Sequence, residues 1–144
     1  MGESVLDLSP LRKAIASLEG GLKTVNDSPW FNSQSEEVRH TLLAGVIQNF
    51  EFVYEISVKM LKRRIELDAL TPTEADFGNY RNLLRIGAEK GLIKDLEAWF
   101  KYRGMRNNTA HTYDQAKAEQ IYQGIAPFLE DAKDLLSRLE ERNG

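Results

Sequence analysis

The sequence contains no cysteine, which excludes disulfide bonds, thiolate zinc sites, iron–sulfur clusters and cysteine nucleophiles. Its only histidines are His40 and His111, so a zinc site would need carboxylates to complete it. No apolar run reaches the roughly 20 residues of a membrane helix, and the first ten residues lack the basic start and apolar run of a signal peptide. These absences favour a cytoplasmic protein that folds without a structural metal and does not contact a membrane.

The charge is distributed unevenly along a chain of one domain's length. The 144 residues carry a net charge of −3, yet residues 81–106 contain seven basic and three acidic side chains. Residues 1–58 contain four basic and eight acidic ones. The negative net charge disfavours indiscriminate nucleic-acid binding, whereas the basic segment 81–106 would attract a phosphate-bearing ligand. A solvated basic helix face is an equally good interpretation of that segment.

Every periodic segment has the spacing of a helix. Apolar residues recur three and four positions apart, and helix start signals precede them at Ser9-Pro10, Ser33 with Glu36, Thr71 with Glu74, Asp95 and Asp114. A long uninterrupted helix is expected over 36–67, and Gly91 is expected to end the helical region that begins at Thr71. No segment alternates like a strand. The sequence therefore predicts one all-α domain over residues 1–144, an up-and-down bundle of four or five helices.

Polar side chains gather in residues 105–113, between an apolar helix and the Asp114 cap. Arg106 and His111 are about 140° apart on a regular helix, so they share a site only if the helix ends between them. One interpretation is a satisfied helix end, with Arg106 paired to a carboxylate. Glu51 and Glu55, one turn apart on the long helix, are either solvated or reach Arg106 or His111 to orient it.

The other interpretation is a phosphodiester site. Arg106 offers a charged fork to phosphate oxygens, and a histidine such as His111 takes or gives a proton near neutral pH. Asn107 and Thr109 can add hydrogen bonds, and Tyr113 a hydroxyl. If the nucleophile is the 2′-hydroxyl of RNA, the reaction needs neither a metal nor another cofactor.

Arg106-x4-His111-x-Tyr113 resembles the signature of the HEPN superfamily, in particular the small HEPN proteins encoded beside minimal nucleotidyltransferases. Residues 47–59 resemble that group's Phe-Glu-x-x-x-Glu segment, and residues 91–107 resemble the stretch that precedes its motif. The resemblance covers residues 5–140.

This resemblance implies a helical homodimer with its two motifs facing one another across a cleft. It implies a metal-independent endoribonuclease that acts as a toxin, with the cognate nucleotidyltransferase as antitoxin. Arg106 and His111 would be catalytic, and Asn107, Thr109 and Glu55 would bind or position the substrate. The partner would attach AMP to Tyr113. The alternative, from an older description of the group, is a non-catalytic substrate- or nucleotide-binding subunit of a nucleotidyltransferase.

Aromatic and basic residues outside the motif carry further expectations. Trp99, Phe100 and Tyr102 exceed what a small bundle needs in its core, which predicts a dimer through the fourth helix. Tyr80 and Phe77 are interpreted as core or interface anchors, with base stacking the less favoured role. The run Lys62-Arg63-Arg64 is interpreted as a solvated helix end, with RNA contact again less favoured.

Overall fold

The computed structural model describes residues 5–112 and 114–144, and within them all regular structure is helical. The elements are α1 (Ser9–Asn26), α2 (Ser28–Asn32), α3 (Glu36–Asp68), the 3₁₀ turn η2 (Pro72–Ala75), α4 (Tyr80–Glu89), α5 (Leu96–Asn107), the 3₁₀ turn η3 (Thr109–His111) and α6 (Gln115–Arg142). The predicted all-α class is confirmed. The described residues form six α-helices rather than four or five, because α2, a single turn, was not expected.

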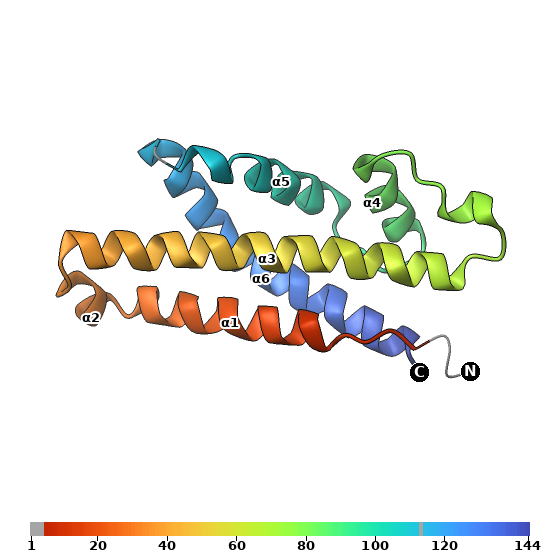
Figure 1. Ribbon diagram of the computed structural model, residues 1–144, viewed down its shortest axis with the longest axis horizontal. Coiled ribbons are helices and arrows are strands. Elements are labelled where there is room, and N and C mark those ends of the chain that lie inside the picture. Colours follow the sequence, from red (N-terminus) through yellow and green to blue (C-terminus); the bar gives the residue numbers. More distant parts are fainter. Residues whose placement is uncertain (1–4, 113) are drawn as a thin grey trace.

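The long helix α3 runs the length of the molecule, and the other helices pack around it (Figure 1). Helix α1 lies antiparallel along one side, α4 and α5 lie on the other, and α6 crosses obliquely behind. The first described residues and the end of α6 lie together at one end of the molecule, whereas the α5–α6 connection lies toward the opposite end.

The long helix begins at residue 36 as predicted, but its predicted cap is wrong, and so is the helix start predicted at Thr71. Helix α3 is capped by Ser35, whose Oγ accepts a hydrogen bond from the Val38 amide at 3.2 Å, because the Ser33 hydroxyl donates instead to the Trp30 carbonyl. The Thr71 signal produces only η2. Gly78, at φ +73°, then redirects the chain, and α4 begins after Asn79 as its cap.

The predicted starts of α5 and α6 are confirmed. The Asp95 carboxylate accepts from the Ala98 amide at 3.1 Å, and the Asp114 carboxylate accepts from the Ala116 and Lys117 amides. Gly91 follows α4 in the left-handed conformation at φ +77°, as expected of a glycine that ends a helix. The segment that carries the polar motif is therefore bounded by predicted signals on both sides.

An aromatic cluster fixes α5 against α3 and α6. The Trp99 and Tyr102 rings of α5 meet the Phe128 ring of α6 edge to face, with centroids 5.8 Å and 5.0 Å apart, and Phe50 of α3 meets Phe128 at 4.8 Å. The Tyr102 hydroxyl also donates to the Asp131 carboxylate. Trp99 and Tyr102 are only 2% and 3% exposed. Both are core residues of a single chain. The prediction of a dimer had counted them as more aromatic residues than the core needs, and that argument is wrong for these two residues.

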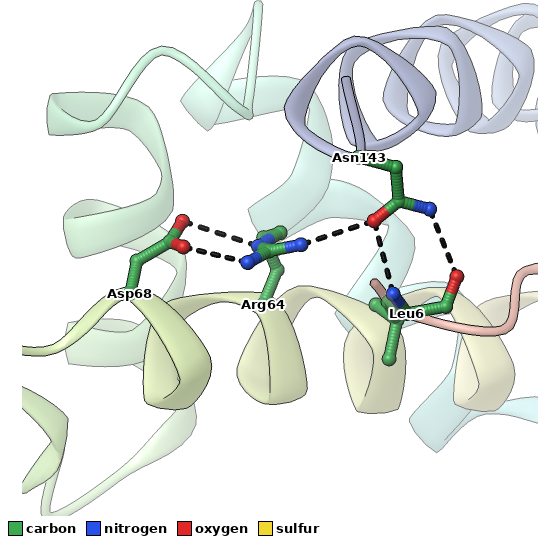
Figure 2. A network of polar contacts seen from close by, with 4 residues as sticks. All are labelled: Leu6, Arg64, Asp68 and Asn143. Carbon is green, nitrogen blue, oxygen red and sulfur yellow. Dashed lines mark hydrogen bonds and ion pairs between the residues drawn. The ribbon is translucent and has the colours of Figure 1, made fainter. Parts of the chain in front are cut away.

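A buried guanidinium joins the end of α3 to both ends of the chain (Figure 2). Arg64 donates from Nε and Nη2 to the Asp68 carboxylate at 3.1 Å and 2.6 Å, and from Nη1 to the Asn143 Oδ1 at 3.0 Å. The same Asn143 amide accepts from the Leu6 N–H and donates to the Leu6 carbonyl. The side chain of Arg64 is 1% exposed. The interpretation of residues 62–64 as a solvated helix end is therefore wrong for Arg64.

We expect Arg64→Ala to lower the free energy of unfolding by about 3 kcal/mol, because the change removes a buried charge and strands its partners. Urea titration followed by circular dichroism measures this loss. The matched control is Arg63→Ala on the next position, where the side chain is 60% exposed and 4.0 Å from Glu66. Arg63→Ala should lower the free energy of unfolding by less than about 0.5 kcal/mol. Equal losses in the two variants would contradict the assigned role of Arg64.

Candidate functional site

The polar motif lies where α5 ends and the chain turns into α6. The amide of Asn108 donates to the Gly104 and Met105 carbonyls and closes the helix after Asn107. The turn η3 follows, in which the His111 amide donates to the Asn108 carbonyl at 2.9 Å. Because the helix ends between Arg106 and His111, the 140° separation of a regular helix does not apply to them.

Two carboxylates of α3 hold the Arg106 guanidinium. Its Nε and Nη2 donate to Glu55 Oε1 at 3.0 Å and 2.5 Å, and its Nη1 lies 3.3 Å from Glu51 Oε2. Of the alternatives left open by the sequence, both glutamates reach Arg106. Hydrogen bonding to Glu55 raises the pKa of the Arg106 guanidinium above its already high ordinary value. The side chain is therefore charged at every pH at which the protein is folded.

Thr109 also fixes the Arg106 side chain by hydrogen bonding. Its Oγ1 accepts from Arg106 Nη1 at 3.1 Å and donates to the Arg106 backbone carbonyl at 2.8 Å. Thr109 is buried, and its hydroxyl thus ties the guanidinium to the turn that begins η3. Arg106, Thr109 and Glu55 therefore lie together, and their roles toward a substrate stay predictions.

The remaining motif residues lie around this group. His111 ends η3 and is half-buried, and Asn107 is exposed at the last position of α5. Within the described part of the chain, the Asn107 side chain makes no hydrogen bond to Arg106. Tyr113 lies outside the described residues.

The charges at this site leave limited room for an anion. Arg106 contributes one positive charge and Glu51 and Glu55 two negative ones, so the three sum to −1. A guanidinium has five N–H groups, and three of those on Arg106 are used in hydrogen bonds between described residues. Of the two others, the one on Nη1 faces Glu51 at 3.3 Å, which leaves the second one on Nη2 for a phosphate oxygen. Glu55 is about half-exposed and can move away to release two more donors.

Neither a metal centre nor a membrane span is found in the regions that the structure describes. No three side chains among histidines, aspartates and glutamates gather there as metal ligands. No described helix is long and apolar enough to cross a bilayer.

The sequence analysis missed a groove that begins beside this site. The groove holds about 740 Å³ between α3 and the chain from η2 to the start of α4, and Glu55 is part of its wall. Phe77 is buried, so its interpretation as a core residue is confirmed. Tyr80 lines the groove and is 48% exposed, so it is not a core residue. The sequence did contain one sign of this groove wall. Lys59 and Lys62 follow Glu55 at spacings of four and three, which places all three on one face of the helix.

Comparisons with known proteins agree on the family. The model of the family described as nucleotidyltransferase substrate binding protein like matches residues 6–141. A protein of Haemophilus influenzae named probable ribonuclease HepT is 44% identical over 138 residues, which are 96% of this chain and 94% of that protein. A solved structure of HI0074 from the same organism, described as the fold of a substrate binding domain of a nucleotidyltransferase, has a TM-score of 0.89 and 42% identity. It covers 93% of this chain and 99% of that one.

Proposed function

The chain belongs to the nucleotidyltransferase substrate binding protein like family, and from this membership we propose that it is a HEPN-type endoribonuclease, the toxin of a pair whose antitoxin is a nucleotidyltransferase. The observation that carries the proposal is the 44% identity, over nearly the whole chain, to a protein named probable ribonuclease. The position of Arg106 supports the proposal. Its guanidinium is fixed by Glu55 at the end of α5, just before His111, and a guanidinium binds phosphate oxygens well.

The proposed reaction is attack by the RNA 2′-hydroxyl on the adjacent phosphorus. A bond from O2′ to phosphorus forms and the bond to O5′ breaks, leaving a 2′,3′-cyclic phosphate and a 5′-hydroxyl. His111 would accept the 2′-hydroxyl proton or supply one to the leaving oxygen. Arg106 would stabilise the charge on the pentacoordinate transition state. Thr109 and Glu55 would position Arg106, and Asn107 would contact the phosphate.

We propose that the site is composite and forms in a homodimer. Each chain supplies one motif histidine, whereas the two proton transfers are best divided between two groups. The exposed face of α3 beside Glu51 and Glu55 fits a second copy. Residues 41–50 carry no charge, and their exposed side chains, Thr41, Ala44 and Gln48, are followed by Phe52, which is 50% exposed.

A second candidate function is a non-catalytic subunit that binds a substrate or nucleotide for a nucleotidyltransferase. The description of the HI0074 structure favours it. Both candidates need the Arg106 site to bind a phosphate. They differ in whether His111 then moves a proton.

We propose that the partner enzyme silences the nuclease by adding AMP to Tyr113. The tyrosine oxygen would attack the α-phosphorus of ATP, releasing pyrophosphate and the hydroxyl proton. Tyr113 lies two positions after His111 in the sequence. A phosphate attached there would pair with Arg106 and occupy the place of the RNA backbone.

We expect purified protein to cleave RNA in EDTA and to leave 2′,3′-cyclic phosphate ends. Arg106→Ala and His111→Ala should each lower the cleavage rate by roughly 10²–10³-fold. Labelled RNA resolved on a gel measures the rate, and His40→Ala, which changes an exposed histidine at the start of α3, is the matched control. Arg106→Ala should stay folded, because a half-exposed ion pair contributes less than about 1 kcal/mol. Activity that requires added magnesium, or that survives His111→Ala, would contradict the mechanism.

We expect a dimer at micromolar concentration in sedimentation velocity. Phe52→Glu should convert it to a monomer and abolish cleavage, because the change inserts a charge into an uncharged face. Leu70→Glu is the control, since Leu70 is 90% exposed in the loop after α3 and should leave the dimer intact. A monomeric wild-type protein that cleaves RNA would exclude the composite site.

We expect Tyr113→Phe to fold normally and to accept no AMP from the partner nucleotidyltransferase, because the acceptor oxygen is gone. Intact-mass spectrometry after incubation with the partner and ATP detects the added mass. The toxicity of Tyr113→Phe in cells should then persist when the partner is co-expressed. AMP found on another residue would refute this account of regulation and leave the nuclease assignment untouched.

A further inference from the structure

The groove next to Arg106 has the shape and chemistry of a subsite. Its volume of about 740 Å³ is within the range of small-molecule sites. Glu55 belongs both to its wall and to the ion pair with Arg106, so the groove begins where the candidate phosphate site ends. An RNA strand bound at Arg106 would therefore have this groove next to it.

Tyr80 provides an aromatic platform in this groove. The Arg103 guanidinium lies over the Tyr80 ring, 4.2 Å from its centroid, which fixes the ring through a cation–π contact. Tyr80 is nevertheless half-exposed and lines the groove. An exposed, fixed aromatic ring beside a phosphate site is suited to stack on a nucleobase.

Two lysines supply charge along the same wall. Lys59 and Lys62 follow Glu55 by four and seven positions, which places them about 6 Å and 10 Å further along α3. Both are exposed, and neither enters an ion pair with another described residue. The carboxylates of Glu66 and Asp76 also line the groove, and Glu66 lies beyond both lysines on α3. The positive stretch of this wall is therefore short.

A buried hydroxyl in the groove wall has no internal partner. Tyr54 is 4% exposed, and its hydroxyl makes no hydrogen bond to any described residue. Burial raises the pKa of Tyr54, and the nearby Arg103 guanidinium opposes that shift. Less than 1 Å² of the hydroxyl oxygen is exposed, so the hydroxyl is not available to a ligand in the groove.

We propose that this groove is a nucleotide subsite in which the base stacks on Tyr80 and the phosphate meets Lys59 and Lys62. The assignment of this nucleotide to the RNA strand, next to the cleaved phosphate, rests on the proposed ribonuclease function. A free nucleotide has the same base and phosphate chemistry, so the test has an arm for each source.

The test measures binding separately from cleavage. A fluorescent 2′-O-methyl oligonucleotide has no free 2′-hydroxyl and cannot be cut, and its binding is followed by anisotropy. Tyr80→Ala should weaken binding by roughly 5- to 50-fold, while Tyr80→Phe, which keeps the ring, should stay within about twofold of wild type. Circular dichroism verifies that each variant is folded.

The lysines are tested through salt dependence. Changing Lys59 and Lys62 together to Gln should make the slope of log K against log salt shallower by about 0.7, since the contact with one phosphate is lost. The matched control removes the same charge from α1, with Lys13 and Lys23 changed to Gln, and should leave the slope as in wild type.

The remaining arms identify the source of the nucleotide and separate the two proposals. Loss of ATP binding in Tyr80→Ala, measured by calorimetry, with oligonucleotide binding unchanged would assign the groove to a free nucleotide and overturn the RNA assignment. Tyr80→Ala that binds both ligands as wild type does would overturn the subsite, even if the wild-type protein cleaves ordinary RNA. A wild-type protein that binds through Tyr80 and cleaves nothing would keep the subsite and remove the nuclease.

Discussion

The edge-to-face packing of Trp99 and Tyr102 against Phe128 determines how closely α5 approaches α3. Phe50 of α3 meets the same Phe128 ring, so one aromatic side chain of α6 sets the spacing of the other two helices. At that spacing the Arg106 guanidinium reaches across to Glu55 at 2.5 Å. The ion pair is partly exposed and weak, and its geometry is a consequence of the aromatic core beneath it.

The sequence predicted best what local chemistry decides. The caps at Asp95 and Asp114 and the glycine at Gly91 lie where backbone groups need a partner or a left-handed turn, and such needs are visible within four residues. The pairing of Arg106 with α3 carboxylates could only be left as an alternative, since Glu55 is 51 positions away. Which carboxylates Arg106 pairs with depends on the aromatic packing of α5 against α3 and not on any local sequence pattern.

The errors share one cause, which is tertiary context. Arg64 stands in a run of three basic residues typical of a helix surface, yet it is buried and bonds to Asn143, 79 positions away. Tyr80 was expected as a core or interface anchor, yet it lines the groove and stays half-exposed even though Arg103 lies over its ring. In both cases the exposure depends on elements that are distant in sequence.

The bridge between Leu6 and Asn143 has a consequence for how the molecule can be connected to others. These residues are 137 positions apart in sequence and are joined by two hydrogen bonds through one side-chain amide. The first described residues and the end of α6 therefore lie at the same pole of the protein. The α5–α6 connection lies toward the opposite pole (Figure 1). A tether, surface or fluorophore fixed through the C-terminus would thus lie near the groove, because Arg64, which bonds to Asn143, stands between the groove residues Lys62 and Glu66 on α3.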